Sequence, residues 1–385
     1  MSLHHNPRIV TDGLVFAYDM DNAAKSFKGK PTTNLITSTI DNWSGSSLRN
    51  ATLLNETYKR SAVYRLEVAA GADPATNVDA YYMYNVPNLS EGDVFTFSAD
   101  VRVIQKSTAT SQTSAADNGF WIWYAGSSEH VNFKDLELGK WTNIQVTATV
   151  GSTYDYIWAR IDHDNSIIDI ANIQLEQQPF ATPFVNGTRS NTQALLDMSK
   201  SKNTITATSL TYSSDGTFEF DGTSDYITIP EPNVGLSPNS WTIEGWINPE
   251  NQRSFFITPN SNGIDNFLEY DNTNKRIAVK VCESADTNER YFYSDSQSVP
   301  LNTWSHFSAS ISNLNVKLYI NGANHVDQTE TISMSDWSGI WHIGRRANGT
   351  FYLDGSLSNI KIYNRALTAA EIQQNFNATR GRFGI

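Results

Sequence analysis

The chain has 385 residues, a formal net charge of −12 and one cysteine, Cys282. The negative charge argues against a nucleic-acid partner, and one cysteine cannot form an intrachain disulfide, so packing alone must hold the fold together. The sequence contains no run of about 18 apolar residues and no secretory signal at its N-terminus, so we expect no membrane insertion.

Aromatic residues make up 12 % of the chain, and Thr, Ser, Asn and Gly are abundant, which favours strands joined by polar turns. The first predicted strand, GLVFAYDM at residues 13–20, alternates and is rich in Val, Phe and Tyr. Within residues 33–189 the further predicted strands are 62–70, 78–86, 93–104, 119–126, 141–150, 154–162 and 167–177. Short strands at hairpin spacing predict a β-sandwich rather than a parallel α/β sheet.

Alternation along two of these strands separates a core face from an outer face, because successive side chains point to opposite sides. In residues 93–104 the odd positions from Phe95 to Val103 are apolar, and in residues 154–162 Ile157, Ala159 and Ile161 belong in the core. The alternate positions include aromatic and charged residues. Trp and Tyr can stack on the apolar face of a sugar, while Arg and Asp can hydrogen-bond its hydroxyls. We therefore predict one carbohydrate-binding sheet surface that contains Trp123, Tyr156, Trp158, Arg160, Arg102 and Asp100.

Four segments of this block resemble the β-sandwich carbohydrate-binding modules often appended to glycosidases: NLITSTIDNWSG, GDVFTFSADVRV, LELGKWTNIQVTATV and IDIANIQLEQQPFATPFVNGTRS. The resemblance implies aromatic sugar contacts, which we assign to Trp123 and Trp158, and a structural calcium whose ligands it does not identify. The alternative is that these two residues and Trp121 simply fill the interior of the sandwich.

A second block of strands spans residues 192–367 and begins with a hairpin at 216–230 around a tight Asp-Gly turn. The further predicted strands are 240–250, 276–284, 304–312, 315–323, 339–347 and 355–368. A short helix follows, and Thr368 with Glu371 three residues later predicts a capping box at its start.

This second block resembles laminin G-like, concanavalin A-like jelly rolls in FEFDGTSDYITIP, TIEGWINP, VKLYINGA and WHIGRRANGTFYLDGSLSNIKIYNRALTAAEI. Many members open with a phrase like GLVFAYDM that is closely followed by one like LLDMSKSKNTIT, which begins here only at Leu195. The resemblance therefore implies that the first block is inserted after the first jelly-roll strand, and that residues 13–20 pair beside residues 360–363. The alternative is an N-terminal arm that packs against neither domain.

We accordingly predict an all-β chain of two antiparallel β-sandwich (jelly-roll) domains, the first inserted into the second after its first strand, with a short C-terminal helix. The predicted boundaries are 8–30 for the first strand of the laminin G-like domain, 31–190 for the inserted sandwich, 191–379 for the remaining jelly roll and 380–385 for a C-terminal tail. A compact domain whose ends lie close together can enter an exposed loop at modest entropic cost.

We predict no catalytic residues. Jelly-roll glucan hydrolases need two carboxylates that flank the bond, usually in the pattern E-x-D-x-x-E. The nearest fragment is FLEYDNTN, in which Glu269 and Asp271 alternate but position 274 is Asn. The polar segment at residues 162–164 is interpreted as a hairpin turn, and Cys282 as a small core residue.

A structural calcium site remains open at three aspartates beside the Gly turns of the jelly roll, Asp221, Asp225 and Asp354. Calcium prefers carboxylate and carbonyl oxygens. The alternative is that Asp is present there because it favours tight turns for backbone reasons.

Both ends of the chain, NPRIVTDGLVFAYDMDNA and IYNRALTAAEIQQNFNATRGRFGI, resemble structural proteins of tailed bacteriophages, notably large marine ones. The resemblance implies a non-enzymatic protein on the virion surface, hence extracellular, that binds bacterial cell-surface glycans or decorates the capsid or tail. Many copies on one particle would multiply weak sugar contacts. Expected partners are these glycans, other virion proteins and further copies of the chain. The alternatives are a purely structural virion component and, less favoured, a polysaccharide hydrolase.

Overall fold

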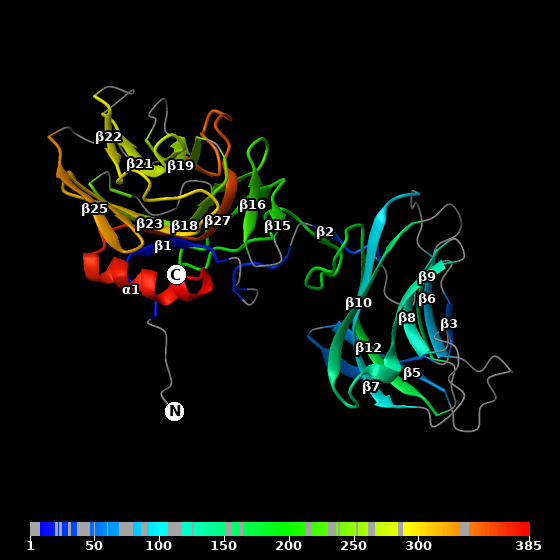
Figure 1. Ribbon diagram of the computed structural model, residues 1–385. Coiled ribbons are helices and arrows are strands. Elements are labelled where there is room, and N and C mark those ends of the chain that lie inside the picture. Colours follow the sequence, from blue (N-terminus) through cyan, green and yellow to red (C-terminus); the bar gives the residue numbers. More distant parts are fainter. Residues whose placement is uncertain are drawn as a thin grey trace. The chain divides into compact units, whose positions relative to one another are not determined.

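The computed structural model contains two compact units, Met1–Pro31 with Ser190–Ile385 (unit 1) and Thr32–Arg189 (unit 2) (Figure 1). The predicted all-β fold class is confirmed, since both units are built from antiparallel sheets and unit 1 adds a short C-terminal helix, α1 (Ala369–Thr379). No helix in the described part of the chain is long and apolar enough to cross a bilayer. The structure describes residues 8–19, 22, 25–29, 32–36, 47–49, 51–59, 61–68, 80–85, 91–106, 118–124, 127–150, 156–161, 165–212, 217–229, 236–237, 239–251, 253–260, 266–283, 288–331 and 339–385.

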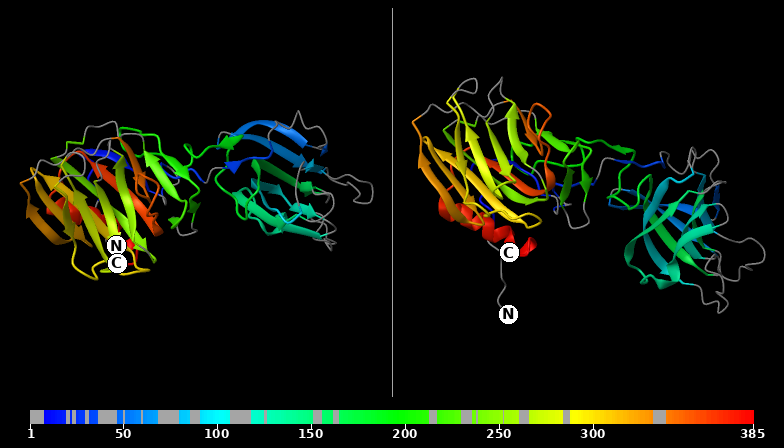
Figure 2. Two further views of the ribbon diagram at one scale, coloured as in Figure 1. Left: turned by 90° about the horizontal axis from the view of Figure 1, so that it is seen from above. Right: turned by 45° about the horizontal axis from the view of Figure 1, so that its top comes forward.

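Unit 1 is a sandwich of two antiparallel sheets, which form its two layers in Figure 2. The eight-stranded sheet has the order β15 (Thr211–Tyr212), β16 (Phe218–Asp221), β27 (Asp354–Tyr363), β18 (Ser240–Pro249), β23 (Ser305–Ser312), β24 (Asn315–Ile320) and β25 (Ala323–Thr329), and β1 (Leu14–Ala17) also pairs with β27. The seven-stranded sheet has the order β14 (Thr206–Thr208), β17 (Tyr226–Ile229), β26 (Ile340–Ile343), β19 (Ser254–Asn260), β20 (Phe267–Asp271), β21 (Arg276–Val281) and β22 (Arg290–Tyr293).

The core of unit 1 lies between these sheets because alternate residues of their strands are apolar. Trp241 and Ile243 of β18 and Ile277, Val279 and Val281 of β21 are fully buried in one cluster. Helix α1 covers the outer face of the eight-stranded sheet beside β18, β23 and β27 (Figure 1). The outer face of the seven-stranded sheet lies on the other side of the sandwich from this helix.

Strands β1 and β16 pair with the same edge of β27, which explains how a long segment of chain can be inserted between these two strands. Phe16 of β1 pairs with Ile362 in one half of β27, whereas Phe218 of β16 pairs with Leu357 in the other half. The returning chain is also tied to β1, because the Asp197 carboxylate accepts a hydrogen bond from the backbone N–H of Ala17 at 3.0 Å. Unit 2 is therefore inserted between two segments that together complete one edge of the sheet.

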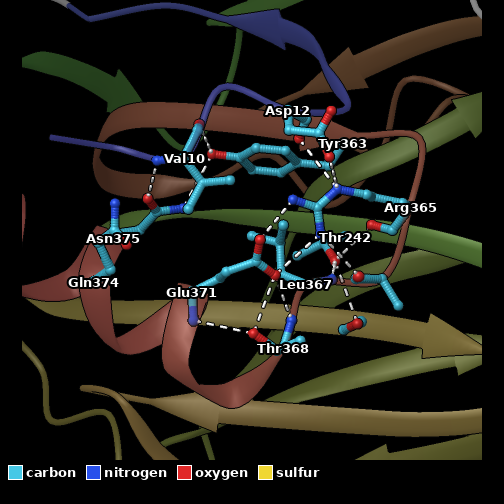
Figure 3. A network of polar contacts seen from close by, with 12 residues as sticks. Val10, Asp12, Thr242, Tyr363, Arg365, Leu367, Thr368, Glu371, Gln374 and Asn375 are labelled. Atoms are coloured by element: carbon cyan, nitrogen blue, oxygen red, sulfur yellow. Dashed lines mark hydrogen bonds and ion pairs between the residues drawn. The ribbon is translucent and has the colours of Figure 1, made fainter.

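The N-terminal segment is fastened to helix α1 and β27 by buried hydrogen bonds (Figure 3). The backbone N–H of Val10 donates to Asn375 Oδ1 at 2.7 Å, and its carbonyl accepts from Tyr363 Oη at 3.0 Å. Val10, Leu367 and Ile372 are buried together beneath these polar contacts. The two ends of the chain thus stabilise one surface of unit 1.

The predicted capping box at the start of α1 is present (Figure 3). The Thr368 side chain accepts from the Glu371 backbone N–H, and the Glu371 carboxylate accepts from the Thr368 backbone N–H at 2.9 Å. Arg365 pairs with Glu371 at 2.6 Å and with Asp12 at 3.0 Å. The hydrogen bond from Arg365 is the main reason that the pKa of Glu371 falls to about 2.

The C-terminal residues 380–385 are largely exposed, but two of their side chains contact unit 1. The Phe383 ring stacks on Trp246 with 4.1 Å between ring centroids and contacts Trp304 at 4.8 Å. Arg382 forms a bidentate ion pair with Asp19 at 2.9 and 3.0 Å. Arg382 therefore has an acidic partner within unit 1.

Unit 2 contains two five-stranded antiparallel sheets and a two-stranded pair at its ends, β2 (Thr32–Thr33) with β13 (Thr188–Arg189). The first five-stranded sheet has the order β10 (Trp141–Thr149), β7 (Val94–Gln105), β12 (Ile167–Glu176), β5 (Ser61–Glu67) and β4 (Ala51–Tyr58). The second has the order β3 (Ser47–Arg49), β6 (Ala80–Asn85), β11 (Tyr156–Ile161), β8 (Asn118–Tyr124) and β9 (Ser127–Asn132). The core between the two sheets includes Val101, Ile144, Leu66, Ala159 and Ile161.

Candidate functional site

The six predicted sugar-binding residues lie on two different sheets of unit 2. Asp100 and Arg102 belong to β7, whereas the other four belong to β8 and β11 of the second sheet. Because the core lies between the sheets, the outer positions of β7 and those of β8 and β11 are on opposite sides of the sandwich. The structure therefore does not bring the six residues together. Alternation separates inward from outward positions, but it does not say to which sheet a strand belongs.

The strand register brings the aromatic positions of β8 and β11 together. Tyr156 pairs with Trp123, Trp158 pairs with Trp121, and Arg160 occupies the next alternate position of β11. The side chains of these five residues lie outside the part of the chain that the structure describes. Their contact with a sugar stays a prediction.

Asp100 is tied into contacts with its own unit. It is 3 % exposed, and its carboxylate accepts hydrogen bonds from Asn172 Nδ2 at 2.6 Å and Asn143 Nδ2 at 3.1 Å. Lys59 Nζ lies 3.2 Å from the same carboxylate. A sugar hydroxyl could reach Asp100 only by displacing these donors.

Arg102 is engaged in the same way, beneath the end of the β4–β5 hairpin. Its guanidinium pairs with the buried Asp169 at 2.7 Å and with Glu56 at 2.9 Å, and it lies 4.7 Å from the centre of the Trp141 ring. Tyr58 of β4 stacks on Trp141 of β10 at 4.2 Å, although β4 and β10 form opposite edges of the sheet. The end of the hairpin therefore crosses the outer face and covers the predicted sugar contact.

Unit 1 carries a second surface of aromatic and charged residues, which the sequence analysis did not identify. We name it the β20–β22 face. On the outer side of the seven-stranded sheet it contains the strand residues Phe267, Glu269, Asp271, Arg276, Lys280, Tyr291 and Tyr293. Three residues outside the strands join it through side-chain contacts: Arg253 with Glu269, Glu289 with Lys280, and Phe351 with Arg253.

Alternation in three neighbouring strands creates this face. In β22 the central Phe292 is buried in the core, and the flanking Tyr291 and Tyr293 are 39 % and 40 % exposed. Across the sheet, Tyr293 is paired with Ala278 and Tyr291 with Lys280. The two tyrosine rings are nearly parallel, with 6.1 Å between their centroids.

Each of the three cations of the face is paired with a carboxylate: Arg253 with Glu269, Arg276 with Asp271 at 2.9 Å and Lys280 with Glu289 at 2.6 Å. The contact between Arg253 and Glu269 is bidentate, and its second hydrogen bond is 2.9 Å long. The Arg276 guanidinium also lies 3.9 Å from the centre of the Tyr293 ring. Burial, together with the charge of Glu269, raises the pKa of Tyr293, which stays a neutral phenol.

Phe351 is held at the margin of the face in an unfavourable backbone conformation. Its φ of +53° lies in the left-handed region, which bulky residues rarely adopt. The ring is nevertheless 42 % exposed, and the Arg253 guanidinium lies 5.4 Å from its centre. Strain of this kind is concentrated at functional sites, where it positions a side chain in advance.

The carboxylates nearest to a glucan-hydrolase pattern are on this face, and both are paired with arginines. Burial raises the pKa of Asp271, but hydrogen bonds from Asn274 and Arg276 outweigh burial and hold the pKa below its ordinary value. A glycosidase acid instead needs a raised pKa so that it can donate a proton. Asp271 therefore lacks the environment of a glycosidase acid.

The other residues considered for catalysis are a polar segment and the single cysteine. The segment 162–164 lies outside the described residues. Cys282 is fully buried, and its backbone N–H donates to Asn266 Oδ1 at 3.0 Å. Its position agrees with a small core residue.

Two of the predicted calcium ligands, Asp221 and Asp225, sit at one turn, and Asp354 pairs with Asp221 across β16 and β27, but a metal cluster is not formed among the described residues. Asp221 accepts hydrogen bonds from the backbone and side chain of both Thr223 and Ser224, at 2.7–2.8 Å. Burial and the nearby charge of Asp221 raise the pKa of Asp225 to about 6. The described residues include no group of three His, Cys, Asp or Glu side chains that could hold a metal ion. Because the turn itself uses the Asp221 oxygens, the three aspartates, including Asp354, do not fit the expected site, and calcium binding stays an untested prediction.

Residues 221–373, within unit 1, match a family model described as the concanavalin A-like lectin/glucanases superfamily. The two-sheet sandwich of unit 1 agrees with this match. None of the curated proteins matches the chain.

Among solved structures, the binding domain of botulinum neurotoxin serotype D is 15 % identical, with 49 % of this chain and 50 % of that chain covered and a TM-score of 0.40. The serotype G binding domain is 16 % identical, with 48 % of each chain covered and a TM-score of 0.41. The serotype D ligand binding domain in complex with N-acetylneuraminic acid is also 16 % identical, with 49 % of each chain covered and a TM-score of 0.41. The chain thus spans about half the length of these structures.

Proposed function

We propose that this protein is a non-enzymatic, carbohydrate-binding protein of a tailed-bacteriophage virion, where it adheres to glycans on the bacterial surface. The lectin type of fold in unit 1 is compatible with sugar binding but does not locate a site. The virion assignment rests on the resemblance of the two ends of the chain to phage structural proteins.

The β20–β22 face is the observation that carries the binding proposal. Three exposed aromatic rings, Tyr291, Tyr293 and Phe351, offer apolar surface to the C–H face of a sugar. Charged groups that are already held in place surround the rings, so little conformational entropy would be lost on binding. The strained backbone of Phe351 is consistent with a ring positioned for a ligand.

The paired aromatic positions of β8 and β11 in unit 2 remain a second candidate surface. Two weak sites on one chain, repeated over many copies on a virion, would give a strong overall attachment. Each site alone would then need only modest affinity for its sugar.

A glycan array tests the proposal. The protein, biotinylated and tetramerised on streptavidin, should bind a subset of bacterial polysaccharides, and Phe351→Ala should weaken that binding. The absence of binding by the tetramer would overturn the proposal and favour a structural virion component. Release of reducing ends from a bound polysaccharide would overturn the non-enzymatic part.

A further inference from the structure

We infer that the β20–β22 face selects uncharged sugars over sugars that carry a carboxylate or sulfate. The inference rests on the proposed glycan binding and adds the chemical class of the ligand. It follows because each cation of the face is already paired with a carboxylate of the chain.

A lectin site for acidic sugars needs a cation that can form a new ion pair, often a bidentate pair from arginine. The three cations of the face each contact a carboxylate of the chain. At the start of β22, Arg290 is likewise paired with Glu330 at 3.3 Å. The charges of the face therefore balance, and its field does not attract an anion.

Replacing one of these carboxylates by an acidic sugar would be costly. The Glu269 side chain is only 5 % exposed, so loss of Arg253 would leave a buried, unpaired charge. The Lys280 side chain is 3 % exposed and reaches its partner Glu289 at 2.6 Å. The overall charge of −12 opposes polyanionic ligands further.

The same arrangement favours hydroxyl groups. A carboxylate has about four lone-pair positions, so one that accepts from an arginine can still accept from a hydroxyl. Glu289 accepts from Lys280 and from the Tyr291 hydroxyl, and its side chain is 39 % exposed beside the Tyr291 ring, so it can still accept from a hydroxyl, whereas Asp271 already accepts four hydrogen bonds within its own turn. A neutral sugar can thus stack on an aromatic ring and donate a hydrogen bond to the neighbouring carboxylate without breaking an ion pair.

Matched oligosaccharides test this selectivity. Binding of the streptavidin-tetramerised protein would be measured for β-1,4-linked hexamers of mannose and of mannuronic acid, a pair that differs only in the group at C6. We expect the neutral member of the pair to bind at least about tenfold more tightly, a difference of about 1.4 kcal/mol. That binding should change little between low and high salt.

A charge-release variant adds a readout that a purely structural role would not produce. Asp271→Asn keeps an acceptor in the turn but leaves Arg276 without its carboxylate, so it should gain binding to the uronic hexamers. Glu269→Gln should do the same for Arg253. The matched control is Asp327→Asn, which releases Lys317 from a 3.1 Å ion pair on the other sheet and should gain nothing.

The outcomes separate this inference from the proposed function. Tighter binding of uronic hexamers by the wild-type protein, or no gain by either release variant, would overturn the selectivity but leave glycan binding intact. Neutral binding that survives both Phe351→Ala and Tyr293→Ala would overturn the β20–β22 face as the site. No binding to any glycan would overturn the proposed function itself.

Discussion

Phe16→Ala should selectively destabilise unit 1, although Phe16 precedes the whole of unit 2 in the sequence. Phe16 is 0 % exposed and belongs to the unit 1 core, and its ring packs edge-to-face on the ring of Tyr18 with 6.1 Å between the ring centroids. Removal of a fully buried phenylalanine ring costs about 3–5 kcal/mol. A cost of about 4 kcal/mol corresponds to an approximately thousandfold change in the opening equilibrium.

Hydrogen exchange read by mass spectrometry can localise this change. Peptides from β18 and β27 should exchange roughly a thousandfold faster in Phe16→Ala, because they share the core that β1 helps to close. Peptides from β7 and β12 should be unaffected. The matched variant is Phe97→Ala in the unit 2 core, also at a 0 % exposed phenylalanine, which should show the reverse pattern. Faster exchange in unit 2, or unchanged exchange in β27, for Phe16→Ala would refute the role assigned to β1.

Three further perturbations test local features. The pKa of Glu371 is lowered from 4.5 to about 2, so its carboxylate stabilises the fold above pH 4.5 and loses this contribution as the pH falls towards 2. Glu371→Gln should lower the free energy of unfolding by roughly 1 kcal/mol at pH 7, after allowance for solvent screening. A variant whose thermal unfolding has the same pH dependence as the wild type would contradict this. The pKa of Asp225 is raised from 3.8 to about 6, so its ionisation destabilises the fold as the pH rises from about 4 to above 6. Asp225→Asn should therefore raise the Tm at pH 8 and leave it unchanged at pH 3.5. If calcium instead raises the Tm of the wild type and Asp225→Asn lowers the Tm, the result would support the predicted metal site. Phe383→Ala should release the C-terminus from Trp246, and trypsin should then cleave at Arg380 and Arg382 faster than in the wild type; equal cleavage rates would argue against this packing.

The fold class could be predicted because strong alternation and turn residues mark most strands. The insertion was accessible because GLVFAYDM and LLDMSKSKNTIT are related by family resemblance although they are far apart in sequence. The structure adds the physical reason, which is that β1 and β16 occupy the two halves of one edge of β27. Sequence patterns alone do not reveal such edge sharing, since it depends on long-range pairing.

The candidate site was less accessible to prediction. Strand β4 went unnoticed because its residues ATLLNETY are mostly exposed and hardly alternate, yet its end determines which partners Asp100 and Arg102 have. The β20–β22 face was missed because β20 and β22, with five and four residues, were not recognised as strands. The available signal was RYFY, where Tyr291 and Tyr293 flank an apolar Phe292 in the pattern of a half-buried strand.

A crystal structure of the full chain with the tightest-binding oligosaccharide from the array would test the central claim most directly. We predict sugar density against Tyr291, Tyr293 and Phe351, with a hydroxyl near Glu289 and the three ion pairs of the face intact. Sugar density elsewhere on either unit, with none on these rings, would contradict the assignment of the site.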